Sequence, residues 1–509
     1  MMGRNEAQLD FFTQYAYERL VPKDHELRRI RETIEMAFVR DLVKDLYCDD
    51  NGRPSWDPEV MIRALFVEFY ADLSDRDLER ELQVNLLYRW FCGLDLNSGT
   101  PDATALVVFR KRLGEERFEK IFDALVKACQ ERGMLVGKVR RVDATHVLAD
   151  VASRNMVNQL RQAQHVLKRT VRTKDSALAD ELEKEFPDRG YLSQKGTEEE
   201  LQEEAERTRK IVQRAKSGGQ TEILTACTTL EGILRGDPGD AVSMVDPEAR
   251  VGHKSAKHSF VGYKVHIAED ESEIITSLDV LSGNAHEGAE LDALLEQEQQ
   301  KGVTATAVVG DSLYESANNY QKVRDRGMQA IFAQRRDQKK ATGFHYDEQR
   351  DVFVCAAEKE SAYRTDRPNG AGAVYTYLQK DCMHCPLKEE CIGEAKMKRQ
   401  RVFLSLVERE ARMREKDPQA QKILAERRNI ERKFGEAKVR HGLRRARYRT
   451  RKRVAVQAWM TFLVINVSLA HVNWASMCGI VEPPCSGSWS HDVRDRGATH
   501  VRVRRATPG

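Results

Sequence analysis

The chain has 509 residues, which is too long for a single ordinary hydrophobic core and predicts two or three folding units. Hydrophobic residues make up 41% of it and charged residues 32%, a balance typical of a soluble globular protein with long solvated helices. The formal net charge of +3 excludes a uniformly basic surface, so any surface for nucleic acid must be local.

Residues 1–135 are predicted to form an all-helical domain. Apolar side chains recur at helical spacing in 57–73, a capping-box pattern at 74–77 opens a second helix, and Thr-Pro at 100–101 opens a third. Short helices joined by capped turns are typical of a helix-turn-helix-like DNA-binding domain, although a plain helical bundle fits the same pattern. The first residues lack the apolar core of a signal peptide, which indicates a cytoplasmic protein.

An α/β catalytic domain with a mixed sheet is predicted for residues 136–345. β-Branched and polar residues alternate in 138–150, and strand patterns return in 258–270 and 273–283, which pair as a hairpin. Helical and apolar strand segments then alternate as far as residue 334. Strands interleaved with helices in this way favour a mixed sheet covered by helices.

Other parts of the chain interrupt or follow this domain. The highly charged stretch 155–245 is helical in propensity with little apolar periodicity, and we expect an inserted arm. Residues 346–394 form a cysteine-bearing insertion, 395–478 return to helix, and 479–509 are predicted to be disordered. The most apolar stretch, 454–477, carries polar residues at spacings that a buried helix tolerates better than lipid does, so we expect a core helix and no membrane span.

Two aspartates stand where α/β sheets commonly hold a site. Asp143 lies in the first predicted strand, and Asp311 follows an apolar strand and a glycine, at the carboxyl end of that strand. A pair of Mg²⁺ ions roughly 4 Å apart needs about three converging acidic side chains, so these aspartates suit a DNA phosphoryl transferase. Each also has an ordinary alternative, as a turn residue or a helix-entry residue.

The third acid is Glu431, in a segment predicted to be one helix over 422–447. Arg427, Glu431 and Lys438 fall within roughly 60° of one another at about 100° per residue. A carboxylate flanked by two cations suits a metal ligand with phosphate-binding neighbours, although an ordinary i,i+4 salt bridge has the same Arg–Glu spacing. Glu436 is a rival acid on the same helix, but it points about 140° away from Glu431.

These motifs resemble the catalytic motifs of bacterial insertion-sequence DDE transposases, which have an RNase H-like fold. The resemblance rests on VDAT around Asp143, GDSLY around Asp311 and the spacing of the Arg427–Lys438 segment, and it extends more diffusely over 15–475. The glutamate helix of that family carries Tyr-x2-Arg-x3-Glu-x6-Lys. Leu424 takes the tyrosine position here, so any DNA contact or water-positioning role of that tyrosine does not carry over.

The resemblance implies an RNase H-like catalytic domain, a helical amino-terminal domain and a cysteine-bearing insertion. It implies that Asp143, Asp311 and Glu431 bind two Mg²⁺ ions, or Mn²⁺, to cleave insertion-sequence ends and transfer the strand to target DNA. Arg427 and Lys438 would then hold phosphates. The partners would be double-stranded DNA and further copies of the chain on it. An RNase H-like nuclease without strand transfer, or an inactive zinc-containing DNA-binding protein, fits the same residues.

A run of cations with almost no acid between them occupies residues 438–453. Such a run is usually a solvated surface or faces an anion, and the phosphate backbone of DNA is the obvious partner. The residues predicted to contact DNA are Arg427, Lys438, Arg440, Arg444, Arg445, Arg447 and Arg449.

Ten cysteines in a cytosolic chain are expected to be thiols or metal ligands rather than disulfides. Cys382, Cys385 and Cys391 are spaced C-x2-C-x5-C, and Cys355 lies upstream. Together they suit tetrahedral ligation of a structural Zn²⁺ that would hold an insertion with little core of its own. His384 could replace Cys355 as the fourth ligand, and small buried cysteines without a metal are the alternative.

Overall fold

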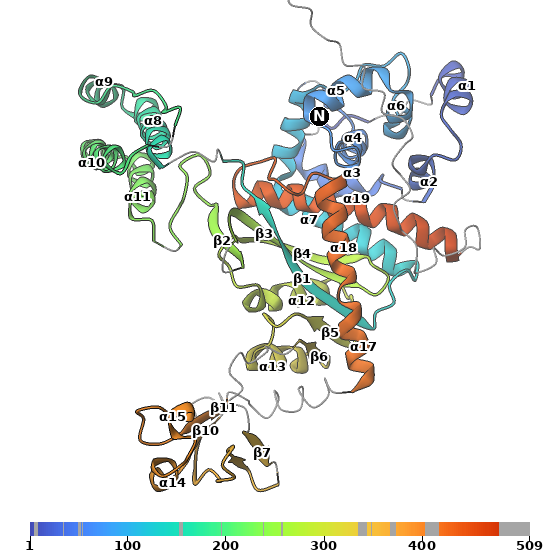
Figure 1. The fold of residues 1–509 in the computed structure, drawn as a ribbon. Coiled ribbons are helices and arrows are strands. Elements are labelled where there is room, and N and C mark those ends of the chain that lie inside the picture. The colour runs from blue at the N-terminus through green and yellow to red at the C-terminus, as the bar shows by residue number, and fades with distance from the viewer. Residues whose placement is uncertain are drawn as a thin grey trace, which may run out of the picture.

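A computed structural model of the chain shows helices around one mixed sheet, with two inserted parts standing away from it (Figure 1). The residues that it describes are 1–4, 9–33, 35–48, 52, 54–151, 156–194, 196–237, 239–255, 258–333, 344–347, 349–366, 373–402 and 417–477. The tail that the sequence predicts to be disordered, 479–509, lies outside these residues.

The amino-terminal part is all-helical, as predicted. Its elements are α1 (Phe11–Leu20), α2 (Glu26–Thr33), α3 (Phe38–Val43), the 3₁₀ helix η1 (Lys44–Leu46), α4 (Pro58–Tyr70), α5 (Asp75–Val84), α6 (Leu86–Cys92) and α7 (Ala103–Glu131). Ser74 caps α5 by accepting a hydrogen bond from the Asp77 N–H, which confirms the capping pattern. The third predicted helix starts later than expected, because Asp102 caps α7, and it continues to Glu131 across a break in helical geometry at Gly114.

The central sheet contains β1 (Val139–Leu148), β2 (Arg250–Ser255), β3 (His258–Asp270), β4 (Ile275–Ser282), β5 (Ala307–Gly310) and β6 (Gln329–Phe332). Its strands are ordered β4-β3-β1-β5-β6, and β2 pairs with the first residues of β3. β3 is antiparallel to both β1 and β4, whereas β5 is parallel to β1 and to β6. Three antiparallel strands followed by two parallel ones is an RNase H-like arrangement, which confirms the expected fold class.

Helices cover both faces of this sheet. On one face, α12 (Leu291–Gln300) and α13 (Ala317–Asp325) pack through buried side chains such as Val142 of β1 and Phe332 of β6. On the other face, the strands β3 and β4 share one hydrophobic core with α7, the amino-terminal helices and the last described helix, α19 (Arg451–Met477). The central sheet and the amino-terminal helices are therefore packed together and do not form separate cores.

α19 corresponds to the apolar stretch predicted to be a core helix. It runs alongside α7 (Figure 1), and the rings of Trp459 and Phe122 lie 4.9 Å apart. The Asn466 amide accepts a hydrogen bond of 2.9 Å from the Ile275 N–H and donates one of 2.8 Å to the Ile275 carbonyl, which ties α19 to β4. The helix is long and apolar enough to cross a membrane, but 83% of its most apolar window is buried inside the protein.

The stretch between β1 and β2 folds into helices with a core of their own. They are α8 (Met156–Lys174), α9 (Ser176–Glu185), α10 (Glu198–Ala215), η2 (Lys216–Gly218) and α11 (Thr221–Arg235). Leu167, Leu182, Ile211 and Cys227 are fully buried among them. Figure 1 shows this arm standing away from the sheet, beyond the end of β1. The prediction of little apolar periodicity is therefore wrong for α8, where Leu160, Ala163, Leu167 and Val171 fall on one buried face.

The cysteine-bearing insertion lies at the opposite end of the molecule from the amino-terminal helices (Figure 1). Its elements are β7 (His345–Asp347), β8 (Val352–Val354), β9 (Tyr363–Asp366), β10 (Ala373–Thr376), α14 (Gln379–Met383), α15 (Lys388–Cys391) and β11 (Arg399–Val402). Its hydrophobic cluster is small, with buried Ala373 and Tyr375 packed by Tyr346 and Phe353. A core of this size holds few residues in place, so another constraint is expected here.

Candidate active site

Asp143 on β1 and Asp311, directly after the neighbouring strand β5, lie at the same level. β1 and β5 pair in parallel with Arg141 opposite Val309, and Asp143 and Asp311 each follow two residues later. Asp311 begins the turn after β5, and its side chain accepts a hydrogen bond of 2.8 Å from the Leu313 N–H. The helix-entry role that the sequence allowed is therefore compatible with a position in the site, because the turn itself lies beside Asp143.

Arg427 links the third acid to the first. Its Nη1 atom lies 3.1 Å from a carboxylate oxygen of Asp143, and its Nη2 atom lies 3.4 Å from one of Glu431. The contact with Asp143 joins β1 to the end of α17 (Pro418–Glu426), so Arg427 does more than form a local i,i+4 pair on a surface helix. The rival acid, Glu436, makes a different contact, at 3.8 Å from Lys433.

The prediction of one helix over 422–447 is wrong. The chain forms α17 and then α18 (Asn429–Arg440), separated by a turn at Arg427 and Arg428. Hydrogen bonds across this turn run to the carbonyl three residues earlier, as in a 3₁₀ turn, which tightens the backbone there. α18 ends before Gly442, whose φ of +68° a glycine adopts without strain.

Asp143 is in surroundings that favour an added cation. Burial, together with the charges of Asp311 and Glu287, raises the pKa of Asp143 to about 7, against the lowering effects of the Ala144 N–H and Arg427. A carboxylate that loses its water shell beside other acids is stabilised in its ionised form by a nearby positive charge. The donors at this place are carboxylate oxygens, which are the ligands that Mg²⁺ and Mn²⁺ take. The residues present therefore fit a divalent ion.

The side chains do not stand in ligating positions, however. In the part of the chain that the structure describes, no three His, Cys, Asp or Glu side chains are grouped closely enough to hold one metal ion. Arg427 contacts two of the three acids in this arrangement. Binding of a divalent ion would therefore require Arg427 to release Asp143 and the acids to draw together.

Tyr314, the tyrosine of the GDSLY motif, is a buried structural residue. Its side chain is fully buried, and its hydroxyl lies 2.9 Å from Nε2 of His266 on β3. Burial raises the pKa of Tyr314, and the charges of Asp143, Glu287 and Asp311 raise it further. Its hydroxyl group is therefore protonated and is buried against His266.

Leu424, at the position where the resembled family has tyrosine, packs against the sheet. It lies with Ile423 on an apolar cluster that includes Val309 of β5 and Ile331 of β6. This contact fixes the end of α17 on the two parallel strands. Leucine in place of the family's tyrosine is therefore accommodated by hydrophobic packing in the last turn of α17, just before Arg427.

Glu287 is a buried acid near the site that the sequence analysis did not single out. It begins the 3₁₀ helix η3 (Glu287–Glu290), its carboxylate lies 2.8 Å from Nζ of Lys264, and its charge contributes to the raised pKa of Asp143. Its local sequence, between a strand and a helix, reads as an ordinary turn. Its burial depends on tertiary packing, so a sequence pattern has no signal for it.

The basic segment after α18 runs beside the end of β1. The Leu148 N–H donates to the Arg444 carbonyl at 3.1 Å, and the Ala446 N–H donates to the Leu148 carbonyl at 2.7 Å. These bonds form a short parallel bridge between the segment and the strand that carries Asp143. The segment predicted to be helical is thus irregular, and it extends the surface of β1.

Several cations on this surface have no acidic partner among the described residues: Lys438, Arg440 and Arg444. Burial and the charges of Lys254 and Arg444 lower the pKa of Lys438 to about 8. Cations that repel one another in this way favour a bound anion.

Arg447 has contacts that favour a structural role over the predicted DNA contact. Its guanidinium lies 3.2 Å from the buried carboxylate of Glu68 and also pairs with Asp72. It stacks over Phe69, 4.6 Å from the ring centroid. Glu68 in turn lies 2.9 Å from Arg110 of α7. One buried carboxylate therefore joins the basic segment to the amino-terminal helices.

We expect Glu68→Ala to lower the free energy of unfolding by about 3–5 kcal/mol, because it leaves two mostly buried guanidinium groups without their shared carboxylate. Urea unfolding followed by tryptophan fluorescence measures the change. Glu116→Ala is the control, since it removes the exposed partner of Lys120 and should leave the transition in place. Equal stability of the two variants would show that the Glu68 contacts do not hold the basic segment.

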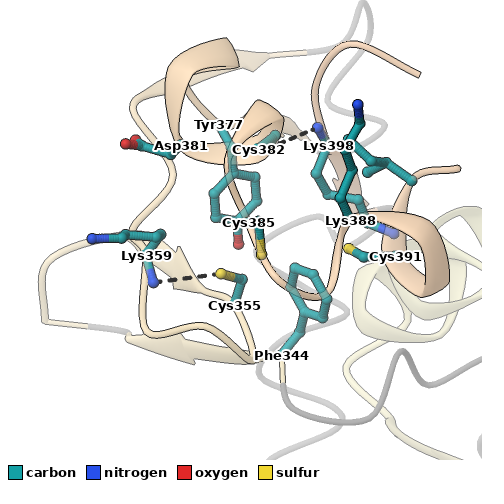
Figure 2. A pocket seen from close by; sticks show the side chains of 11 residues that line it. Phe344, Cys355, Lys359, Tyr377, Asp381, Cys382, Cys385, Lys388, Cys391 and Lys398 are labelled. Atoms are coloured by element: carbon teal, nitrogen blue, oxygen red, sulfur yellow. Dashed lines mark hydrogen bonds between the residues drawn. The ribbon is translucent and has the colours of Figure 1, made fainter. Parts of the chain in front are cut away.

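The four cysteines of the insertion line one cavity, and they are Cys355, Cys382, Cys385 and Cys391. The cavity measures about 30 Å³, which exceeds the roughly 10–15 Å³ that a single water molecule needs. Figure 2 shows the sulfur atoms of Cys355, Cys385 and Cys391 turned toward this space. The Lys359 N–H donates to Sγ of Cys355 at 3.4 Å. The Lys398 N–H donates to Sγ of Cys382, also at 3.4 Å.

This set of sulfurs fits a soft or borderline metal ion by its chemistry. Backbone N–H groups that donate to sulfur stabilise a metal-bound thiolate. Burial raises the pKa of Cys391, and the other three cysteines raise it further, a cost that a cation would remove. The sulfur atoms would have to move closer together to bind an ion, because no three possible ligands among the described residues are near enough to one another to hold one. His384 does not line the cavity; its Nδ1 lies 3.1 Å from the Lys380 carbonyl.

Two family models match this chain. One, described as a transposase domain (DUF772), matches residues 15–112, and the other, a transposase DDE domain, matches residues 235–467. The second range contains Asp311 and Glu431, whereas Asp143 precedes the arm and joins them through the pairing of β1 with β3 and β5. Together the matched ranges cover well over half of the chain. The chain therefore belongs to the insertion-sequence DDE transposases, metal-dependent enzymes that bind and cut DNA.

Proposed function

We propose that this transposase uses Asp143, Asp311 and Glu431 with two Mg²⁺ ions, or Mn²⁺, to cut the ends of its insertion sequence and join the freed strands to target DNA. The observation that carries this proposal is the position of Arg427, 3.1 Å from Asp143 and 3.4 Å from Glu431. A cation that contacts two of the three acids marks a point where positive charge is stabilised.

The acids would bind the metal ions from elements that differ in rigidity, the strand β1 and the helix α18. A bound pair of divalent ions supplies activation of the attacking oxygen and stabilisation of the leaving oxygen. Asp143 is held by the pairing of β1 on both sides, so its carboxylate would fix the position of the site. The side chain of Glu431 is 59% exposed on α18 and has room to turn toward it. Arg427 would then exchange its carboxylate contacts for a DNA phosphate.

The DNA would follow β1 from the acids to the basic segment. Asp143 and Leu148 are separated by about 17 Å at roughly 3.3 Å per residue, which matches about five nucleotides of one strand. Lys438, Arg440 and Arg444 would contact its phosphates. The amino-terminal helices around 57–113 would read the sequence of the end, and further copies of the chain would hold the second end.

Replacing Arg444, Arg445 and Arg449 together with Ala is expected to weaken binding to element ends and to random duplex alike. Phosphate contacts release counterions, so the slope of log K against log salt should become shallower by about one unit per lost contact. Fluorescence anisotropy over a salt series measures both quantities. Folding should be unchanged, because the contacts of Arg445 and Arg449 with described residues are exposed: both lie near the carboxylate of Asp150, and they donate to the Val151 and Asp150 carbonyls.

Two other results would change this assignment. Unchanged affinity and slope in the triple variant would identify the segment as a solvated surface with no partner. Loss of discrimination between element ends and random DNA would move sequence recognition from the amino-terminal helices to this segment.

We also propose that Cys355, Cys382, Cys385 and Cys391 bind one structural Zn²⁺. Support comes from their common cavity, the two backbone N–H groups that donate to sulfur and the small hydrophobic cluster of the insertion. Tetrahedral ligation by four thiolates is typical of structural zinc sites, which contribute directly to the free energy of folding.

The proposed activity is tested on the DNA that flanks the gene. We expect short inverted repeats there, and cleavage at their outer ends with Mg²⁺ but not with EDTA. Folded protein that binds the repeats and cuts nothing in Mg²⁺ or Mn²⁺ would favour an inactive DNA-binding protein. Cleavage without any joined product would favour an RNase H-like nuclease, which would use the same acids.

A further inference from the structure

The turn that carries Glu287 is packed against the turn that carries Asp311. A Cβ atom placed on Gly288 would lie 2.1 Å from the Leu313 carbonyl oxygen, so the two backbones approach as closely as a glycine allows. Glu287 is 8% exposed. Its position is therefore set by contact with the active-site turn and not by the short 3₁₀ helix that it begins.

Asn319 holds the two turns together. Its side-chain amide donates to the Gly288 carbonyl at 2.7 Å and to the Tyr314 carbonyl at 2.9 Å. The side chain is 2% exposed, so water does not compete for these bonds. Any movement of the Glu287 turn would thus be transmitted to the Asp311–Tyr314 turn.

The Glu287 carboxylate is also anchored to the sheet. Nζ of Lys264 lies 2.8 Å from its oxygen and donates to the Ala285 carbonyl at 2.9 Å. Lys264 is on β3, the strand that pairs with β1 alongside Asp143, and it lies two residues before His266, which contacts Tyr314. The charge of Glu287 is therefore fixed with respect to β3 and, through the pairing of β3, with respect to β1.

This arrangement concentrates negative charge at the site. Burial is the main cause of the raised pKa of Asp143 and of Tyr314, and the charge of Glu287 raises both pKa values further. Lys264 and Arg427 supply positive charge on either side of the site. Lys264 compensates Glu287 and Arg427 contacts Asp143, so the three carboxylates of Asp143, Asp311 and Glu287 are matched by two cations, and the remaining negative charge favours a bound cation.

We propose that Glu287 is a fourth carboxylate of the active site, a positioning residue that strengthens divalent-ion binding by Asp143 and Asp311 and keeps the Asp311 turn in place. This inference rests on the proposed function, because it assigns metal binding to those aspartates. Glu287 acts through its charge and through the packed turn. Partners that orient metal ligands typically change metal affinity by about 10–100-fold when they are removed.

The test compares variants that break the same ion pair with opposite effects on charge. Glu287→Gln removes negative charge, and we expect Mn²⁺ affinity, measured by calorimetry on the full chain, to fall by about tenfold or more. Lys264→Met removes the neutralising cation, and affinity should stay the same or rise. Glu287→Asp keeps the charge and should retain most of the affinity. Glu290→Gln, on the same turn but exposed, is the matched control and should change nothing.

A merely structural ion pair would give a different result. Glu287→Gln and Lys264→Met would then lower the melting temperature and the Mn²⁺ affinity together, and this outcome would overturn the proposal. If Lys264→Met does not fold, an equal loss of Mn²⁺ affinity in Glu287→Asp and Glu287→Gln would overturn it as well.

Asp143→Asn separates this inference from the function on which it rests. If Asp143→Asn loses Mn²⁺ binding and cleavage while Glu287→Gln keeps both, the role of Glu287 is refuted and the proposed function stands. If Asp143→Asn keeps both, the proposed function itself fails.

Discussion

Alanine at any one of Asp143, Asp311 and Glu431 is expected to abolish both cleavage and joining of insertion-sequence ends. Each substitution removes a carboxylate from the place where the metal pair would form, and the chemistry depends on that pair. Binding of the ends should remain close to normal, because the basic segment and the amino-terminal helices are untouched. A gel-shift titration and a cleavage assay on the same preparation measure the two effects.

Glu436→Ala is the matched control for the glutamate. Glu436 is on the same helix as Glu431, but it lies near Lys433 and not near Arg427. We expect this variant to cut and join DNA normally. An inactive Glu436→Ala with an active Glu431→Ala would show that the wrong acid of α18 has been assigned.

Exchange of Cys382 and Cys385 for serine is expected to remove the zinc from the protein. The unchanged chain should contain about one Zn²⁺, and the double variant close to none, because two of four thiolates are lost. Elemental analysis by mass spectrometry measures the content. The insertion should also become sensitive to protease, since its hydrophobic cluster is too small to hold it alone.

Cys48→Ser is the control for this experiment. Cys48 is exposed in the amino-terminal part and lies outside the cysteine cavity, so its loss should leave the zinc content and the protease pattern unchanged. Soluble, folded protein without zinc would refute the metal site and favour the alternative of small buried thiols.

The sequence singled out Asp143 and Asp311 because each lies in a strong local pattern. Asp143 is in an alternating strand, and Asp311 follows an apolar run and a glycine. The sequence could not predict that Asp143 and Asp311 lie side by side. Their relative position depends on the parallel register of β1 and β5, which no local pattern encodes. The fold class followed from the order of elements, which local patterns do encode.

The failures have a common physical cause in tertiary contacts. The 422–447 segment has good helical propensity, yet it turns at Arg427, where the side chain reaches Asp143 on β1. Arg447 reads as one more surface cation, yet its partners Glu68 and Asp72 come from the amino-terminal helices. Glu287 reads as a turn residue and is buried by packing against another turn.

The core of the arm was missed for a different reason, because the many charged residues obscured its apolar periodicity. In α8, Leu160, Ala163, Leu167 and Val171 fall on one buried face, and the core forms where such faces pack together. The cysteines are the opposite case. The short spacing of Cys382, Cys385 and Cys391, together with Cys355 upstream, was sufficient to select four side chains that line one cavity.

The most direct measurement for the central proposal is the joining of a pre-cut insertion-sequence end to a target plasmid. The substrate carries a free 3′-hydroxyl, so the assay reports strand transfer and does not depend on the first cut. With Mg²⁺ we expect joined products from the unchanged protein and none from Asp143→Asn. Efficient metal-dependent cleavage of an uncut end, with no joining of the pre-cut one, would contradict the proposal and identify a nuclease.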